Sequence, residues 1–530
     1  MNKENYKMVL VSVNTTWSCG TVGKFGNAYI DQVAGYLRNF DYLIDLKYYR
    51  KKVEEEQICA DIQNNYDFYG FIVTETNYKK CTNIAKEIKH YNPNSLIVFY
   101  GSFPTIFYKE IFNEVKELDY IVLGDGEKPT KLLIEKLLSD RVNASGSLEI
   151  PYIASRYDLK DKRQYFNDEM AYLPAMDFYE NDSSENNAKK IHRIQTKNSV
   201  CSGSCTFCSE RHGKIVYKDT KRIIEEIKLV HEKYGVRRFF FNDNNLFDPN
   251  DQIGKNHVWE LCSEIEKLNF KASYQCYCKA SSLQDTPDDH KILSLMKKVG
   301  FNMVFVGVES GNQEDLELYN KLITIENSRT TISMLKSHGL FPILGFIGFN
   351  PYTTKEKIRK NFDFLCELEC SYLSNYLYSF VNIDKYTGMY EYIKRDGLLK
   401  QPDAYFHVDY DFADKSIIPL VNYIREEMQP KTFDISYEVD DVYHTYLDCK
   451  VWNNSNDGYL EILNEMKLKD FEIIKKYLSI LFVEFDIEKF RKVENDFWNH
   501  FEQNQNKLRE IMAYINALYR STNKCAEIGR

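Results

Sequence analysis

Residues 201 to 208 read Cys201-Ser-Gly-Ser-Cys205-Thr-Phe-Cys208, so three cysteines are spaced C-x3-C-x2-C at the end of an apolar run. The serine and glycine side chains between the first two cysteines are small, which lets the backbone wrap closely. Thiolates at this spacing can converge on one soft metal centre, and iron–sulfur clusters are held by such cysteine sulfurs. Three ligands leave one metal position open, which favours a cluster that binds a further molecule.

A structural zinc site is the alternative reading of this loop. Zinc normally has four ligands, and His212 lies close enough in the sequence to complete a Cys3His set. Two other cysteines, Cys276 and Cys278, lie two residues apart on a predicted strand and so face the same side. Hydrogen-atom donors or extra ligands are possible roles for them, but small buried core residues are the favoured interpretation.

The composition indicates a globular protein of several domains. The chain has 530 residues, of which 43% are hydrophobic and 28% charged, and its thirteen cysteines are dispersed. This length predicts about three domains. A net charge of −9 without a long basic run predicts neither a nucleic-acid nor an anionic-membrane partner, and favours a small-molecule or peptide substrate. No signal-peptide pattern or membrane-length apolar run is present, so we expect a cytoplasmic protein with reduced thiols.

The first 140 residues alternate short apolar runs with amphipathic segments of helix length. Runs that are apolar throughout predict parallel strands covered on both faces. Five such repeats predict a doubly wound parallel sheet, with a ligand crevice beyond the carboxyl ends of the strands. The predicted strands are Met8–Val13, Tyr42–Leu46, Phe68–Thr74, Ser95–Tyr100 and Asp119–Leu123, and the helices are Asn27–Arg38, Lys51–Asn64, Cys81–His90, Thr105–Lys116 and Lys128–Leu138.

A second βα series follows a connector and predicts a partial (β/α)6 barrel. In βα barrels the active-site residues lie at the carboxyl ends of the strands, and the cysteine loop follows the first predicted strand. The six predicted strands are His192–Val200, Arg237–Asn242, Lys271–Cys278, Asn302–Glu309, Phe341–Phe349 and Tyr372–Val381.

The cysteine loop, with Phe207 just before its third cysteine, resembles the signature of the radical S-adenosylmethionine (radical SAM) superfamily. The resemblance implies that Cys201, Cys205 and Cys208 hold a [4Fe–4S] cluster whose fourth iron is chelated by S-adenosylmethionine (SAM). It also implies reductive cleavage of SAM to a 5′-deoxyadenosyl radical, with electrons from a donor such as a flavodoxin or ferredoxin. A motif of this kind is a hypothesis until its structural context agrees.

The resemblance implies SAM contacts at the ends of the barrel strands. Glu309, in the sequence Gly307-Val-Glu-Ser-Gly311, ends a buried strand and would be satisfied by an ammonium or ribose hydroxyls; a salt-bridged or solvated carboxylate is the alternative. Lys279 could pair with the SAM carboxylate, or lie in the core with its ammonium reaching solvent. The full expected set is Phe207, Asn242, Asp243, Lys279, Glu309, Ser310, Gly345 and Gly348.

The N-terminal domain resembles the cobalamin-binding domain of one large radical SAM branch, chiefly in Gly101–Thr105 and Asp119–Glu127. The resemblance implies cobalamin contacts at Asn14, Thr15, Glu75, Thr76, Gly101, Ser102, Gly124, Gly126 and Glu127. The Asp-x-His-x-x-Gly motif is absent, so no histidine ligand to cobalt is expected. The alternative is a flavodoxin-like domain that binds no cofactor.

The predicted domains are residues 1–140 for cobalamin, a connector at 141–190, a barrel at 191–395 and a mainly helical region at 396–530. In this last region the predicted helices are Leu460–Lys467, Asp470–Leu481 and Ile487–Tyr519.

Three functions are left open. The first is a cobalamin-dependent radical SAM C-methyltransferase that acts at an unactivated carbon of a small metabolite or peptide. The second is a radical SAM cyclase, epimerase or rearrangement enzyme that transfers no methyl group. The third is a non-catalytic metal-binding protein built on a zinc knuckle.

Overall fold

The computed structural model forms two compact units. The first comprises most of the chain up to Val200 together with Gly213–Val236, and the second comprises Cys201–His212 and Arg237–Arg530. The structure describes residues 6–14, 26–50, 53–62, 66–139, 150–160, 163–181, 187, 190–209, 213–369, 373–400, 407–431, 442, 445–451 and 458–528. Among these residues, no helix has the length and apolar character that crossing a membrane requires.

A twisted sheet in the order β2-β1-β3-β4-β5-β6 forms the centre of the first unit. The five predicted strands are present and parallel, as β1 (Met8–Asn14), β2 (Ile44–Arg50), β3 (Phe68–Ile72), β4 (Leu96–Tyr100) and β5 (Tyr120–Val122). The sixth strand, β6 (Ile153–Ser155), is antiparallel to β5 and was not predicted. It lies in the segment that the sequence indicated as a connector.

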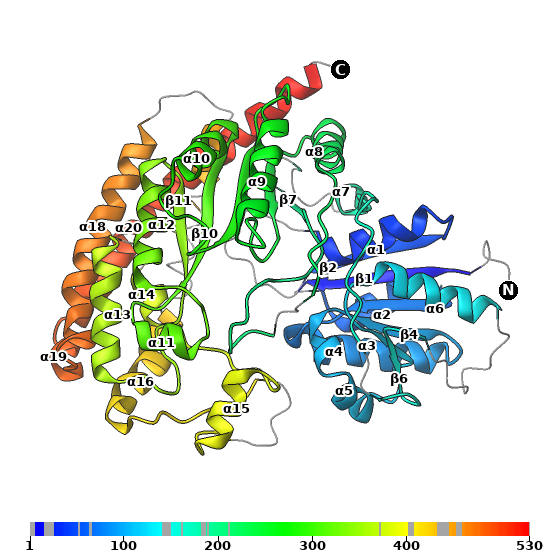
Figure 1. Ribbon diagram of the computed structural model, residues 1–530, viewed down its shortest axis with the longest axis horizontal. Coiled ribbons are helices and arrows are strands. Elements are labelled where there is room, and N and C mark those ends of the chain that lie inside the picture. Colours follow the sequence, from blue (N-terminus) through cyan, green and yellow to red (C-terminus); the bar gives the residue numbers. More distant parts are fainter. Residues whose placement is uncertain are drawn as a thin grey trace. The chain divides into compact units, whose positions relative to one another are not determined.

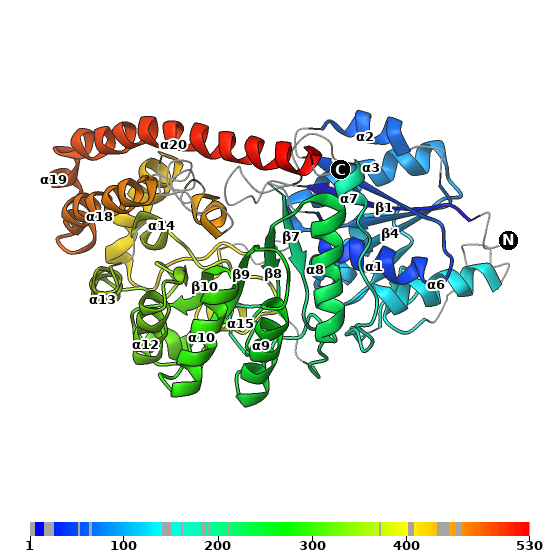
Figure 2. The same ribbon diagram turned by 90° about the horizontal axis from the view of Figure 1, so that it is seen from above.

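Helices cover both faces of this sheet, as a doubly wound fold requires. Figure 2 shows α1 (Ala28–Arg38) and α6 (Glu127–Ser139) on one face and α2 (Glu55–Ile62) and α3 (Tyr78–Tyr91) on the other. The Asn27 side chain caps α1 by accepting hydrogen bonds from the backbone N–H groups of Tyr29 and Ile30. Between β4 and β5 lie α4 (Ser102–Ile106) and α5 (Tyr108–Glu114), where one helix was expected.

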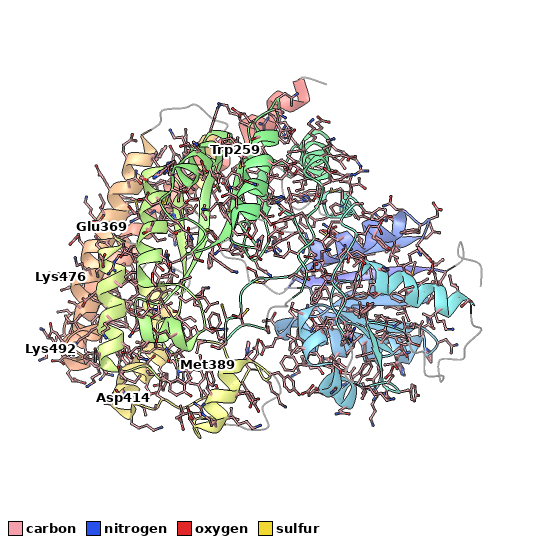
Figure 3. The ribbon with its side chains drawn as sticks, in the orientation of Figure 1. Trp259, Glu369, Met389, Asp414, Lys476 and Lys492 are labelled. Carbon is pink, nitrogen blue, oxygen red and sulfur yellow. The ribbon has the colours of Figure 1, made fainter. Side chains whose placement is uncertain are left out.

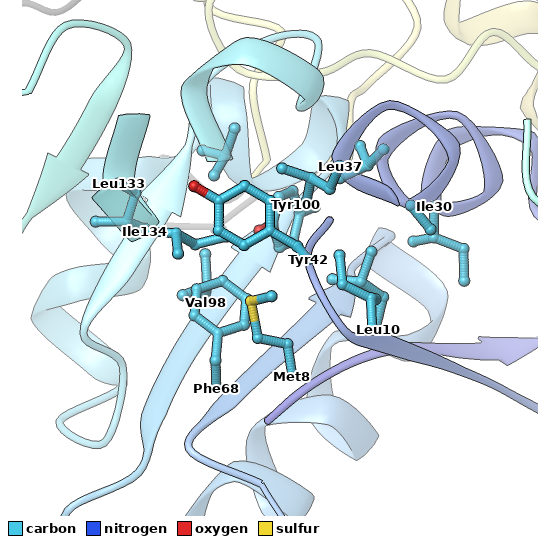
Figure 4. Packing of buried hydrophobic residues seen from close by; sticks show 14 of the residues in the cluster. Met8, Leu10, Ile30, Leu37, Tyr42, Phe68, Val98, Tyr100, Leu133 and Ile134 are labelled. Atoms are coloured by element: carbon cyan, nitrogen blue, oxygen red, sulfur yellow. The ribbon is translucent and has the colours of Figure 1, made fainter. Parts of the chain in front are cut away.

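The core beneath α1 and α6 is apolar and well covered. Figure 4 shows Leu37 of α1 and Leu133 of α6 close to strand residues such as Leu10 and Val98, each at most 1% exposed. Strand residues on both faces are buried, which explains why these strands read as continuous apolar runs.

The second unit holds parallel strands in the order β11-β10-β9-β8. These are β8 (Arg238–Phe241), β9 (Ser273–Lys279), β10 (Phe301–Glu309) and β11 (Phe341–Phe346). On one side of them lie α9 (Gln252–Ile265), α10 (Pro287–Val299) and α12 (Ile325–Ser337) (Figures 1 and 2). The first predicted barrel strand forms β7 (Ile191–Ile194), at the end of the first unit, and is shorter than expected.

Among residues 373–381 the sixth predicted barrel strand is not formed, and Tyr372 lies outside the described residues. Residues 373 to 377 form the short helix α14 (Leu373–Leu377), and only Phe380 makes an isolated parallel bridge, to Phe349. Short apolar runs fit a helix as well as a strand, and periodicity alone does not separate the two. The partial-barrel architecture is confirmed, with strands β7 to β11 present and the sixth replaced by α14.

The C-terminal region is helical, as predicted. The first two predicted helices form one continuous helix, α18 (Tyr459–Phe482), and the third is divided into α19 (Ile487–Arg491) and α20 (Glu494–Ile528). Asp448, which precedes these helices in the sequence, contacts residues at the amino ends of two barrel strands. That carboxylate is fully buried and lies 2.5 Å from Nε of Arg238, while Nδ2 of Asn302 donates to it at 2.6 Å.

Candidate active site

The three cysteines of the predicted loop line one cavity of about 370 Å³ in the second unit. Strand ends supply most of the remaining wall, including Asn242 after β8, Lys279 on β9 and Glu309 on β10. Phe207, Tyr277 and Phe305 give the cavity aromatic surface. The predicted rule that functional residues collect at the carboxyl ends of the strands therefore holds for this cavity.

Thr206 fixes the cysteine loop to the rest of the second unit. Its N–H donates to the Tyr319 carbonyl at 2.9 Å, and its carbonyl accepts from the N–H of Met389 at 2.7 Å. Its hydroxyl donates to the Leu318 carbonyl at 2.8 Å. Met389, labelled in Figure 3, is in the first turn of α15 (Gly388–Arg395). The next residue, Phe207, packs edge-on against the Tyr319 ring, with 5.3 Å between the ring centroids. The loop is therefore held in one position by these contacts.

Lys279 contacts the first half of the loop. Its Nζ donates to the Ser202 hydroxyl at 2.7 Å and lies 3.4 Å from Oδ1 of Asp248. Asp248 is fully buried and also accepts from the Ser202 N–H at 3.2 Å and from the Ser202 hydroxyl. The side chain of Lys279 thus lines the cavity and is held by a buried carboxylate. Asp248 was not predicted, and no motif around it in the sequence marks it.

Glu309 is paired with a residue that was not predicted. Its Oε1 lies 2.7 Å from Nζ of Lys321, and the two side chains are 13% and 10% exposed. The backbone of Glu309 has φ of +65°, an uncommon conformation for a residue other than glycine. A Cβ on Gly307 would lie 2.9 Å from both Glu309 Oε1 and Lys321 Nζ, so a larger residue there would push the paired ends of these two side chains aside. Glu309 therefore forms a salt bridge, which was the alternative to a SAM contact, and this salt bridge lies in the wall of the cavity.

The charges in the cavity influence one another. Burial alone lowers the pKa of Lys321, but the neighbouring Glu309 carboxylate and the Cys205 and Cys208 thiols raise it above its usual value. Burial raises the pKa of Cys205, and Lys321 opposes that rise. A positive charge beside a cysteine sulfur favours the thiolate, which is the form that binds metals.

The donor set fits an iron–sulfur cluster, whereas the zinc alternative depends on His212. A tetrahedral zinc ion needs its ligands to converge on one point. Among the described residues, no three His, Cys, Asp or Glu side chains converge in this way, and His212 lies outside the described residues. A [4Fe–4S] cluster offers a separate iron to each thiolate, and three cysteines around one cavity suit that arrangement. Cys201 Sγ also accepts from the Gly203 N–H at 3.3 Å.

Several predicted SAM contacts lie apart from the residues that line the cavity. Ser310 is fully buried and its hydroxyl donates to Oδ1 of Asn361 at 3.0 Å. Gly348 faces the carbonyls of Tyr376 and Leu377. Asp243 is buried, and its neighbour Asn244 lines the cavity together with Asn242. For these residues a SAM contact stays a prediction.

Gly345 lies beside the cavity. A Cβ there would be 3.0 Å from the Phe305 ring and 3.6 Å from Oε2 of Glu309. Cys276 is fully buried and Cys278 is 3% exposed, and burial raises the pKa of Cys278 to about 12. Both cysteines therefore match the favoured interpretation as buried core residues, although Cys278 also contributes to the cavity wall.

In the first unit, loops that follow three strands meet at one edge of the sheet. Gly101 has φ of +116°, and a Cβ there would lie 2.9 Å from the Val73 carbonyl. The Thr105 hydroxyl donates to the Gly101 carbonyl at 2.7 Å and accepts from the Gly124 N–H at 3.1 Å. Gly101 and Gly124, two of the predicted crevice residues, are therefore brought together, and this edge fits the place where doubly wound sheets bind ligands.

Some predicted cobalamin contacts have structural roles there. Gly124, with φ of +94°, would place a Cβ 2.1 Å from the Tyr165 carbonyl, and Gly126 is packed against Tyr29. Glu127 is buried and accepts from Nδ2 of Asn167 at 2.9 Å. Asn14 ends β1, Glu75 and Thr76 begin the 3-10 turn after β3, and Ser102 begins α4, whereas Thr15 lies outside the described residues. Cobalamin contacts at all these residues stay predictions.

Two family models match the chain. Residues 197–365 match the radical SAM superfamily, and residues 22–134 match the B12-binding domain. The first match contains all three cysteines, Lys279, Glu309 and Lys321, and the second contains most of the β1–β5 sheet.

Solved structures share the fold. The cobalamin-dependent SAM radical enzyme OxsB, with aqua-cobalamin and SAM bound, superposes with a TM-score of 0.71 at 16% identity over 99% of this chain and 81% of that one. The radical SAM methyltransferase TsrM from Kitasatospora setae, with tryptophan and a SAM analogue bound, gives 0.59 at 14% identity over 74% of this chain and 77% of that one.

Among curated relatives, an uncharacterised methyltransferase of Pyrococcus horikoshii is 24% identical over 58% of this chain and 65% of its own length. The anaerobic magnesium-protoporphyrin IX monomethyl ester cyclase of Rubrivivax gelatinosus is 26% identical over 61% of this chain and 59% of its own length. The chain thus matches less than two thirds of the length of these relatives. The chain thus carries a radical SAM domain, with three cysteines around its barrel cavity, and a B12-binding domain.

Proposed function

We propose that the protein is a cobalamin-dependent radical SAM C-methyltransferase that acts at an unactivated carbon of a small metabolite or peptide. The observation that carries the proposal is the presence of a B12-binding domain and a radical SAM domain on one chain. Relatives that are named methyltransferases, and the likeness in fold to TsrM, support methyl transfer as the reaction.

When bound, the cluster and SAM would supply a 5′-deoxyadenosyl radical, and cobalamin would supply a methyl group. The residues of the chain would bind and orient these molecules. Cys201, Cys205 and Cys208 would hold the cluster, and Glu309 would accept hydrogen bonds from the SAM ammonium or ribose. The aromatic rings of Phe207, Tyr277 and Phe305 would exclude water from the cavity.

The second candidate is cyclisation, epimerisation or rearrangement without methyl transfer. The specific observation in its favour is the 26% identity to the magnesium-protoporphyrin cyclase. Both candidates use the same cysteine cavity, so its geometry supports them equally.

The same proposal includes a cytoplasmic location, a flavodoxin or ferredoxin as electron donor, and residues 1–140 as the cobalamin-binding domain. The B12-binding match at residues 22–134 supports the last of these assignments, and the dispersed cysteines support the first.

The two candidates can be separated before the substrate is known. The protein would be purified anaerobically, reconstituted with iron and sulfide, and incubated with reductant and SAM, with or without cobalamin. We expect S-adenosylhomocysteine to form only when the protein holds cobalamin, above the level of a reaction that contains cobalamin and reductant but no protein. Formation of 5′-deoxyadenosine without S-adenosylhomocysteine, in protein that holds cobalamin, would reject methyl transfer in favour of the second candidate.

A further inference from the structure

The turn that carries Lys321 is fixed against the cysteine loop. It links α11 (Gln313–Leu318) to α12, and its residues Asn320 and Leu322 have φ of +49° and +55°. Nδ2 of Asn320 donates to the Ser204 carbonyl at 2.9 Å and to the Ser204 hydroxyl at 2.8 Å. Ser204 directly precedes Cys205. The backbone of Lys321 is therefore held beside the middle of the loop that supplies the three thiols.

The side chain of Lys321 is held as firmly. Its ammonium pairs with Glu309 at 2.7 Å, and only a tenth of the side chain is exposed. Gly307 leaves the space that the ammonium occupies. Lys321 lines the same cavity as Cys201, Cys205 and Cys208. A fixed, charged group thus shares a partly buried cavity with the three sulfurs.

Such a charge acts strongly on a redox centre. Coulomb interactions are weakened much less in a buried cavity than in water. A cluster gains one negative charge when it accepts an electron, so a nearby positive charge stabilises the reduced form and a nearby negative charge destabilises it. The potentials of iron–sulfur clusters depend on charge and solvent exposure in this way.

We propose that Lys321 is a positioning residue that raises the reduction potential of the cluster held by Cys201, Cys205 and Cys208, and that its partner Glu309 lowers it. The ion pair therefore sets how readily the electron donor reduces the cluster, while the Lys321 ammonium keeps Glu309 at the cavity wall. The proposal concerns the cluster alone and holds whether or not the substrate is methylated.

The test is a redox titration of the reconstituted full-length protein, with the reduced cluster followed by EPR and with neither SAM nor substrate present. Lys321→Met should shift the midpoint potential to a more negative value than that of the wild type. Glu309→Gln should shift it to a more positive value, and the double variant should lie between the two single variants. Lys298→Met removes the cation of an exposed pair with Glu266 and serves as the control, because solvent screens it. Its potential should equal that of the wild type.

The proposal would be overturned if Lys321→Met had full iron content and the midpoint potential of the wild type. It would also be overturned if Lys321→Met and Lys298→Met shifted the midpoint potential by the same amount. If Lys321→Met assembles no cluster, Lys321→Arg and Glu309→Gln decide. The arginine keeps the charge and should keep the potential, whereas an unchanged potential in Glu309→Gln would contradict the electrostatic role.

Discussion

Glu309→Ala tests whether the carboxylate at the end of β10 binds SAM. The substitution removes the acceptor of a charge-assisted hydrogen bond, worth roughly 1.5–3 kcal/mol. Because each 1.4 kcal/mol is a factor of ten in affinity, we expect the Kd for SAM to rise about tenfold to about a hundredfold. Glu309→Gln keeps a neutral acceptor of the same size and should lose less affinity. Both variants should retain the cluster, since the carboxylate lies beside the thiols and is not one of the predicted ligands.

The assay is calorimetric titration of SAM into reconstituted protein under anaerobic conditions, with iron and sulfide measured on the same samples. Glu314→Ala is the matched control, because Glu314 is an exposed carboxylate on the neighbouring α11 that lies 3.7 Å from Lys357. Its affinity for SAM should equal that of the wild type. An unchanged Kd in Glu309→Ala would refute the role of Glu309, and so would an equal loss in Glu314→Ala.

Three further predictions concern packing and charge. Gly307→Ala should weaken SAM binding in the same titration, because its Cβ would displace the Glu309–Lys321 pair. Asp448→Ala should destabilise the second unit by about 3–5 kcal/mol in thermal unfolding, because it removes the carboxylate that pairs with the buried Arg238 guanidinium. Burial raises the pKa of Asp31 well above its usual value, so folding favours its neutral form and stability falls as pH rises above about 4. Asp31→Asn should therefore be more stable than the wild type at pH 8 in denaturant titrations, with a difference that shrinks towards pH 4; a constant difference would contradict this.

The sequence predicted those parts of the fold that depend on local pattern. The strands of both sheets lie close to the expected ranges, because few other folds can bury apolar runs of this length that alternate with amphipathic helices. The segment Tyr372–Val381 was assigned to a strand and contains the helix α14, since a short apolar run carries no unique period. The unpredicted β6 is a short antiparallel strand outside the alternating βα series, so no repeat indicated it.

The candidate site was predicted where one motif carries the chemistry and missed where partners come from distant elements. The three cysteines and Glu309 line one cavity as expected. Lys321 lies in a turn, and nothing in its neighbours shows that the turn folds back onto the cysteine loop. Asp248 was missed for the same reason, because its contact with Lys279 depends on how the turn after β8 meets β9. Contacts of this kind follow from the assembled fold and have no signature in local sequence.

The central claim is that Cys201, Cys205 and Cys208 hold a [4Fe–4S] cluster with one iron open to SAM. EPR of the reduced, reconstituted protein with and without SAM tests it most directly, with iron and sulfide measured in the wild type and in Cys201→Ala, Cys205→Ala and Cys208→Ala. The account predicts about four irons and four sulfides per chain, a reduced-cluster signal that changes when SAM is added, and loss of the cluster and of SAM cleavage in each variant. A colourless protein that contains zinc, a signal that SAM leaves unchanged, or full iron content and activity in any of the three variants would contradict it.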